Sequence, residues 1–322
     1  MYYRTLLTLF LFAAIHAVAQ TPVSLSALHP VAIRLRPAEM DSSAFSHFEV
    51  LDERADTGRI GIHTCIPDFG RNYDRQLVFS HSAATELAGY LNSRFARAGS
   101  PYTALVILRT LWLSDANYVR AEYLRNPERR MERTHIRLKA EVYAFQDGRY
   151  IPLLRFDTLQ TAMKKRILQE RSPYFEWGVN LTELLDNLVD SASALARGKA
   201  MANRRVDLDD IREFNASRFN APIDDNLPAR GVYASFEEFR NNTPSIQHFE
   251  IKVENHQRVI YIQESGATYY THDAWGYCDG KDFYIMRDGV LCPAWKEGKA
   301  FFSKEFKQPR IYFVDMDTGD IY

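Results

Sequence analysis

The sequence predicts an α+β fold, in which an N-terminal sheet with two packed helices is followed by a small, aromatic-rich antiparallel β domain. Three observations support this prediction. Several short segments alternate apolar and polar residues, as half-buried strands do. Two longer segments place apolar residues at helical spacing instead. After residue 230, strand-like segments rich in Phe and Tyr follow one another at intervals of about ten residues.

The division of the chain follows from its length and from where these patterns change. A chain of 322 residues is long enough for two domains. We expect a signal peptide at 1–19, an α+β domain at 20–197, a connector at 198–229 and a β-rich domain at 230–322. The formal net charge is −1 and 25% of residues are charged. These values argue against a globally basic nucleic-acid-binding protein and against an acidic, disordered chain.

The N-terminus has the layout of a secretory signal peptide. Arg4 supplies a positive start, residues 6–15 are an apolar run, and Ala17-Val18-Ala19 offers the small residues that a signal peptidase recognises. We therefore expect cleavage after Ala19 and export to the periplasm or out of the cell. The apolar run is too short for a permanent membrane helix, and no later stretch reaches the ~18 apolar residues of a span.

The α+β domain begins with short strands and a first helix. Residues 31–35 and 60–62 have the pattern of short strands. Apolar residues then recur every three or four positions over 82–98, which predicts a helix. Gly99 suits the end of that helix and Pro101 blocks its continuation.

A hairpin follows the first helix. Residues 103–113 and 135–145 are strand candidates, and Asp147-Gly148 supplies a turn into a partner strand at 150–156. Along the second candidate, one face carries Ile136, Leu138, Ala140 and Val142, and the other carries Arg137, Lys139 and Glu141. We therefore expect one buried face and one polar face.

A second helix closes the domain. Asn180 is placed to cap it and Glu183 takes the capping-box position. Apolar residues line one face up to about residue 197, and Gly198 lies where the helix would end. We expect an antiparallel or mixed sheet with both helices packed on one side.

The connector and the β-rich domain complete the chain. The connector is polar and contains a predicted helix over 207–219, so we expect it to pack on a domain or to act as a hinge. Ser235 begins a short helix that ends near Asn241. The strands expected after it cover residues 248–253, 258–263, 274–277, 283–286, 290–292, 300–303 and 311–314. This spacing favours a meander, a small barrel or a sandwich.

The chain has three cysteines, and export would permit a disulfide. Cys278 and Cys292 lie close in sequence within the strand-rich region, so they are a candidate pair that leaves Cys65 over. The alternative is that all three are small buried residues without a bridge.

Four aromatic residues are candidates for a binding groove: Trp275, Tyr277, Tyr284 and Trp295. Aromatic faces bind sugars and peptides by stacking and apolar burial, but the same residues also build the cores of small β domains. Strand alternation would place Trp275 and Tyr277 on one face. Both interpretations, a groove and a core, stay open.

No sequence motif for an enzyme, a metal site or a cofactor is present. His63, Cys65 and His81 have metal-binding side chains, but no second close pair completes a ligand set, so we expect no metal and no cofactor. His81 lies between two serines, where its geometry for a nucleophile–base pair is poor; we interpret this segment as the start of the first helix.

A run of charges at residues 120–133 contains five Arg and three Glu. A basic patch would meet phosphate or lipid headgroups. Because both signs are interleaved, we favour a solvated hairpin tip or a short exposed helix.

Two resemblances concern separate parts of the chain. GVYASFEEFRNNTPS at 231–245 and AWGYCDGKDFYI at 274–285 resemble exported, uncharacterised proteins of Bacteroidota. LDERADTGRIGI at 51–62, with the helix and strand that follow it, is similar to small α+β lipoproteins of the bacterial envelope, although this chain lacks their lipid-bearing cysteine. Neither resemblance implies a catalytic residue.

Together these features predict an exported, non-catalytic envelope protein that acts through contacts with another protein or a surface ligand. One alternative is a hydrolase with a site between the domains, where pockets often form. Its candidate polar residues are His63, His81, His272 and Asp273. Another alternative is a module that binds glycans or peptides through the β domain.

Overall fold

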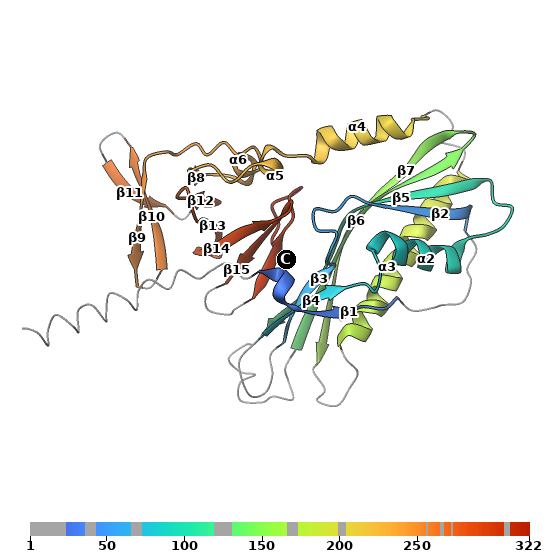
Figure 1. Cartoon of the computed structure of the whole chain (residues 1–322), viewed down its shortest axis with the longest axis horizontal. Coiled ribbons are helices and arrows are strands. Elements are labelled where there is room, and N and C mark those ends of the chain that lie inside the picture. Colours follow the sequence, from blue (N-terminus) through green and yellow to red (C-terminus); the bar gives the residue numbers. More distant parts are fainter. Residues whose placement is uncertain are drawn as a thin grey trace, which may run out of the picture.

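A computed structural model describes residues 24–35, 43–65, 73–118, 131–165, 173–198, 204–255, 257–264, 267–271, 273–305 and 310–322. Over these residues the chain forms a seven-stranded mixed sheet, a six-stranded antiparallel sheet and a three-stranded antiparallel sheet, with helices between and beside them (Figure 1). The predicted α+β class is therefore confirmed. The predicted division of the chain into domains stays a prediction.

The seven-stranded sheet has parallel and antiparallel neighbours. Its strands are β1 (His29–Ala32), β2 (Phe45–Asp52), β3 (Gly61–Cys65), β4 (Tyr73–Val78), β5 (Tyr102–Tyr118), β6 (Met131–Gln146) and β7 (Arg149–Lys165). Their order is β1-β4-β3-β5-β6-β7, and β2 also pairs with β5. Strand β6 pairs along one edge of β5. The other edge of β5 pairs first with β2, up to Leu108, and then with β3, at Leu113 and Ser114. Gly61 permits the approach of β3, since a Cβ there would lie 2.0 Å from the carbonyl oxygen of Leu113.

The hairpin between β6 and β7 forms as predicted. Asp147 and Gly148 have φ angles of 53° and 77°, which are the left-handed values that a two-residue type I′ turn requires. The pairing then runs the whole length of both strands, from Gln146 and Arg149 to Met131 and Lys165. The long strands β5, β6 and β7 form the part of the sheet on which α3 and α4 pack, on opposite faces.

Helices α2 (Ala83–Phe95) and α3 (Pro173–Arg197) cover one face of this sheet. The first helix was predicted over 82–98. It begins as predicted, where the Ser82 hydroxyl caps it by accepting a hydrogen bond from the Thr85 N–H at 3.2 Å, but it ends at Phe95 with Ala96 as its C-cap, ahead of Gly99. The second helix begins earlier than predicted, at Pro173, so Asn180 lies inside the helix and is not its N-cap. The apolar face continues toward the N-terminus, because Trp177 is fully buried in the same core.

The connector includes α4 (Leu208–Phe219), which lies on the opposite face of the sheet, and α5 (Pro222–Asp225), whose Ile223 packs in an apolar cluster of the six-stranded sheet. Helix α4 was predicted, and a reciprocal capping box between Asp207 and Asp210 begins it. Ile211 of this helix packs with apolar residues of β5 and β6. Helix α4 of the connector therefore packs on the sheet, which agrees with the expectation that the connector packs on a domain.

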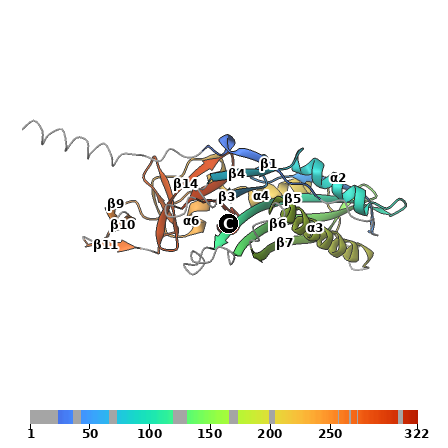
Figure 2. The same ribbon diagram turned by 90° about the horizontal axis from the view of Figure 1, so that it is seen from below.

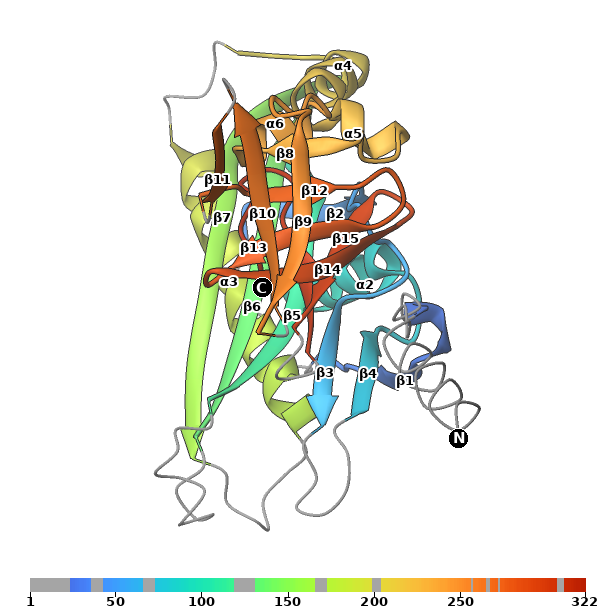
Figure 3. The ribbon, with the colours of Figure 1, turned by 90° about the vertical axis from the view of Figure 1, so that its left-hand side faces the viewer.

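The C-terminal part contains the other two sheets. Its elements are β8 (Gly231–Tyr233), α6 (Phe236–Arg240), β9 (Phe249–Glu254), β10 (Gln257–Glu264), β11 (Ala267–Thr271), β12 (Gly276–Cys278), β13 (Phe283–Arg287), β14 (Val290–Glu297), β15 (Ala300–Lys304) and β16 (Ile311–Val314). The six-stranded sheet has the order β16-β15-β14-β13-β12-β8, and the three-stranded sheet has the order β11-β10-β9. One apolar cluster joins the two sheets, whose strands cross steeply in Figure 3.

The seven-stranded sheet and the six-stranded sheet meet at an interface, called the joint below, that has an apolar half and a charged half. Figures 1 and 2 show the C-terminal sheets at one end of the seven-stranded sheet and α2 and α3 toward the other. An apolar cluster across the joint includes Leu25 of the 3-10 helix η1 (Leu25–Ala27), Trp112 of β5 and Phe313 of β16. Trp112 and Phe313 stack with ring centroids 4.6 Å apart.

Buried charges form the second half of this joint. Lys139 of β6 lies 2.7 Å from the carboxylate of Asp315, which directly follows β16, and 3.0 Å from Asp317. The Nε atom of Arg137 lies 3.5 Å from Asp315. The polar face predicted for residues 135–145 therefore exists, but the C-terminal segment covers it. Within the described residues, no helix combines the length and the apolar character needed to cross a membrane.

Candidate ligand-binding cavity between the sheets

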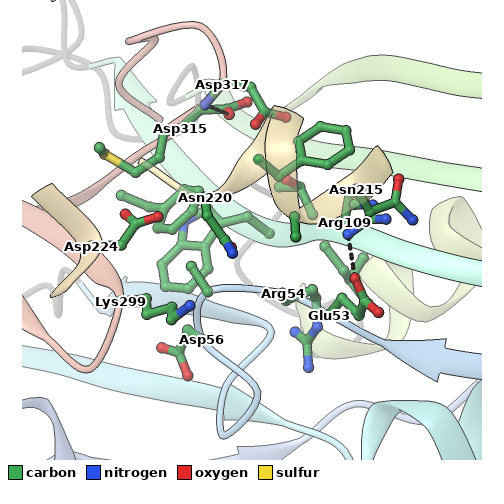
Figure 4. Close-up of a pocket in the computed structure, with 18 of the residues that line it drawn as sticks. Glu53, Arg54, Asp56, Arg109, Asn215, Asn220, Asp224, Lys299, Asp315 and Asp317 are labelled. Atoms are coloured by element: carbon green, nitrogen blue, oxygen red, sulfur yellow. Dashed lines mark hydrogen bonds and ion pairs between the residues drawn. The ribbon is translucent and has the colours of Figure 1, made fainter. Parts of the chain in front are cut away.

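A cavity of about 430 Å³ lies where β5, α4 and the segment after β16 converge (Figure 4). The connection between β2 and β3 closes one side of it, and α5 and Lys299 close another. Ligand sites often form at such junctions between packed units. No residue of this cavity was singled out as a site residue by the sequence.

The β2–β3 connection holds its shape through ion pairs of its own. The Nε and Nη2 atoms of Arg54 each lie 2.8 Å from a carboxylate oxygen of Asp52, and its Nη1 donates to the Arg59 carbonyl at 2.7 Å. Asp56 accepts from the backbone N–H groups of Gly58 and Arg59. The bidentate pair of Arg54 and Asp52 holds the β2–β3 connection in a fixed shape, so that it forms a rigid wall of the cavity. It also accounts for the Asp-x-Arg part of the pattern at 51–62.

Apolar side chains form the base of the cavity. Trp112, Phe313 and Met316 line it from the sheet side and from the C-terminal segment, and Phe219 lines it from the end of α4. Because Trp112 is held by stacking on Phe313, its position is set by the joint described above. The base therefore offers flat aromatic surface beside polar groups.

Arg109 of β5 is the central cation of the cavity. Its Nη1 donates to Glu53, its Nη2 lies 3.6 Å from Glu141, and its guanidinium lies 4.4 Å from the ring centroid of Phe219. The side chain is only 7% exposed. Among the described residues, its Nε and Nη2 atoms have no hydrogen-bond partner. Two donors on a fixed guanidinium thus make no hydrogen bond, and Glu53 balances its charge, because Glu141 is shared with Arg155.

Asn215 of α4 is the most unusual residue of the cavity. It is 2% exposed, yet neither its Oδ1 nor its Nδ2 has a hydrogen-bond partner within the part of the chain that the structure describes. An unsatisfied buried polar group costs about 1–3 kcal/mol. Figure 4 shows Asn215, Arg109 and Glu53 at one end of the cavity. The cavity thus places an unused donor–acceptor amide and an unused guanidinium edge at its buried end.

The opposite end of the cavity carries mainly charged groups. Figure 4 shows Asp224, Lys299 and Asp56 there. Burial raises the pKa of Asp224 above its ordinary value. Asp224 also accepts a hydrogen bond from the backbone N–H of Ala221 at 2.8 Å, which makes it the cap of α5. This end is therefore built mostly by groups that serve the fold.

The four aromatic residues predicted to line a groove do not come together. Tyr277 and Tyr284 stack at 4.9 Å between the two C-terminal sheets. Trp275 stacks on Phe239 at 4.4 Å in the cluster on the other side of the six-stranded sheet. Trp295 belongs to the cluster at the joint. Trp275 and Tyr277 therefore do not share a face as expected, and all four residues contribute to core packing.

The candidate disulfide is not formed. Cys278 and Cys292 are both buried free cysteines. They lie on β12 and β14, with β13 between them. Two strand spacings alone separate them by at least about 9–10 Å, and Cys292 is also offset by two residues along β13. The separation is beyond the Cα distance of about 7 Å that a disulfide tolerates. Burial raises the pKa of the Cys292 thiol to about 11.

The polar residues proposed for a metal or a hydrolytic site also lie apart. His63 on β3 packs edge-on against Trp177 at 5.2 Å. His81 is exposed, and its Nδ1 lies 2.8 Å from Glu86 of the same helix start. Asp273 is exposed beside β11. In the described parts of the chain, no three His, Cys, Asp or Glu residues are placed to hold a metal.

Some of the predicted features lie outside the described residues. They are the signal peptide, the side chain of Cys65, His272 and most of the charge run at 120–133. These predictions stay as they were stated.

Comparisons with known proteins give no family for the chain. No family model and no curated protein matches it. A crystal structure of a Xanthomonas campestris protein, described with the family model DUF330, is similar with 14% identity and a TM-score of 0.26 over 53% of this chain and 97% of that one. A second, described as an uncharacterized protein, has 9% identity and a TM-score of 0.22 over the same shares. TM-scores this low support no statement about function.

Proposed function

We propose that this is an exported protein that acts by binding, and that its cavity holds a small, neutral, polar molecule through Asn215 and Arg109. The observation that carries the proposal is the state of Asn215, which is 2% exposed and has no hydrogen-bond partner among the described residues. A buried position is more stable with an apolar side chain than with a polar one that has no hydrogen-bond partner. A polar side chain kept at such a cost is typical of a binding site.

The chemistry of the ligand follows from the groups left unused. The amide of Asn215 offers one acceptor and one donor group, and Arg109 offers donors from Nε and Nη2. Glu53 and Glu141 already balance the positive charge of the guanidinium. Carbonyl and hydroxyl groups therefore fit better than a full negative charge. The aromatic surface of Trp112 and Phe219 suits a sugar ring or an apolar edge.

Binding rather than catalysis is favoured by the residue types of the cavity. Among the described residues its lining contains carboxylates but no histidine, cysteine or serine. The carboxylates of Glu53, Asp56 and Asp224 are occupied by an ion pair or by backbone groups. Export rests on the signal-peptide pattern of residues 1–19. We further propose that the ligand-bound protein acts in the cell envelope, through contacts with a partner there.

The test is ligand-dependent thermal stabilisation of the full-length chain, produced with its own N-terminal segment. The probes are glucose, N-acetylglucosamine and N-acetylalaninamide, which are neutral and carry both donors and acceptors. A fitting probe present at about 100 times its Kd stabilises the fold by about 2.7 kcal/mol. We expect this stabilisation to disappear in Asn215→Leu.

The matched control is Asn241→Leu, which makes the same change at an exposed position outside the cavity. We expect this variant to retain the response. An equal response in Asn215→Leu, or none with any of the three probes, contradicts the proposal.

A further inference from the structure

A second cavity, of about 300 Å³, adjoins the first. It shares Arg109, Phe219 and Asp317 with the first cavity. Its remaining lining comes from β6, β7, the end of α4, α6 and the segment after β16. Five of the lining residues are basic and three are acidic, so the charge of the cavity wall is positive.

The three acidic side chains are already paired with cations. Asp317 lies 3.0 Å from Lys139. Glu141 lies 3.2 Å from the Nε atom of Arg155. Asp157 pairs with Arg137, which lies outside the cavity lining. None of these carboxylates is left to neutralise the two remaining guanidiniums.

Those two guanidiniums belong to Arg218 and Arg240. Across the described ranges, neither forms an ion pair with a carboxylate. The guanidinium of Arg218 lies 5.1 Å from the ring centroid of Phe219. The guanidinium of Arg109 contacts the same ring, at 4.4 Å. The Nη2 atom of Arg240 donates to the Arg218 carbonyl at 2.6 Å, which ties α6 to the end of α4. The Nε atom of Arg240 is buried and has no partner among the described residues.

We propose that the second cavity is an anion site, in which Arg218 and Arg240 bind a phosphate or a carboxylate group. Guanidiniums present parallel donors that match the oxygens of both groups. Stacking on Phe219 holds Arg218 beside the cavity. The site requires no ligand in the first cavity, so it goes beyond the proposed function. If both sites are used, their shared wall at Arg109 allows one molecule to place a neutral part in the first cavity and its anionic group in the second.

The experiment titrates the full-length protein with inorganic phosphate and, separately, with acetate at low ionic strength. Binding is followed through the arginine side-chain Nε–H signals in ¹⁵N NMR spectra. We expect saturable shifts for Arg218 and Arg240 with at least one of the two anions. Because hydrogen bonds between charged groups are stronger than those between neutral groups, Arg218→Gln is expected to weaken the affinity about tenfold or more.

The matched control is Arg205→Gln, at an exposed arginine that lies 3.9 Å from Asp147 and outside both cavities. This variant removes the same charge and should leave the affinity nearly unchanged. Arg218 is exposed on α4, so its substitution should leave the fold intact. For Arg240, which links two helices, Arg240→Lys is a second variant that keeps the charge and loses the bidentate geometry.

Each outcome decides the proposal. A preference for phosphate assigns a phosphorylated ligand, and a preference for acetate assigns a carboxylate. Absence of saturable binding by both anions overturns the site. Binding that is unaffected by Arg218→Gln and by Arg240→Lys also overturns it. Because neither anion carries the neutral groups that Asn215 would bind, failure here leaves the proposal for the first cavity untouched.

Discussion

Replacing Asp315 with alanine is expected to lower the free energy of unfolding by about 3–5 kcal/mol. Asp315 is 1% exposed and faces two cations of the seven-stranded sheet, Lys139 at 2.7 Å and Arg137 at 3.5 Å. Removing the carboxylate leaves these cations buried without their main partner. The cost therefore arises from stranded charge rather than from the lost contact alone.

Urea unfolding of the wild type and of Asp315→Ala measures this effect. Asp317→Ala is the control, because its carboxylate contacts the same lysine but is 27% exposed. A partly solvated pair contributes about 1 kcal/mol or less. We expect the double variant Lys139→Met with Asp315→Leu to lose much less stability than Asp315→Ala, because it removes the stranded lysine charge. A loss below about 1 kcal/mol in Asp315→Ala would show that the C-terminal segment does not cover these cations in solution.

Replacing Trp112 with alanine is expected to cost about 3–5 kcal/mol, the usual range for a buried Trp. Trp112 is 2% exposed and packs against Phe302 and Phe313, with ring centroids at 5.8 and 4.6 Å. The side chain belongs to β5, whereas both partners belong to the C-terminal sheet. Its removal therefore weakens the apolar half of the joint and widens the base of the cavity.

The measurement is again urea unfolding, with two comparison variants. Trp112→Phe keeps an aromatic ring in the cluster and should lose less stability than Trp112→Ala. Trp295→Ala removes a tryptophan that is only partly buried in the same cluster, so its loss should also be smaller. If Trp295→Ala proves as damaging as Trp112→Ala, the joint is not centred on Trp112.

These two substitutions connect stability to function. The joint positions the aromatic base of the first cavity and two carboxylates in its wall, Asp315 and Asp317. We therefore expect both variants to lose the ligand response proposed above, even at temperatures at which they stay folded.

Much of the fold was predictable because its elements carry strong local patterns. Helix α2 has its capping serine at Ser82, and α4 has its capping box at Asp207. The turn at Asp147 and Gly148 has the residues that its φ angles require. The start of α3 was mislocated because Asn180 resembles a cap, although the apolar face extends back to Trp177.

Other strands carry weaker local patterns. Strands β2, β4 and β11 were not predicted. The segment Tyr73–Val78 of β4 has only one fully buried side chain, Leu77. Strand β11 is almost wholly exposed along its length. Each of these strands is defined by pairing with a neighbour, and such pairing leaves little trace in local hydrophobic periodicity.

The candidate cavities were out of reach of the sequence for a different reason. Arg109 stands in a segment recognised as a strand and Asn215 in one recognised as a helix, but neither belongs to a motif. Their importance depends on which partners they lack, and that is a property of the packed molecule. The polar face of β6 was predicted correctly, but its burial by Asp315 depends on contacts between residues far apart in sequence.

The most direct test of the central claim is the free energy of unfolding of Asn215→Leu in the absence of ligand. Leucine has a similar volume and removes both unpaired polar atoms. We expect the variant to be more stable than the wild type by about 1–2 kcal/mol, and the stability of Asn241→Leu to change by less than about 0.5 kcal/mol. A variant that is less stable than the wild type would show that Asn215 supports the fold, and it would contradict its assignment to a binding site.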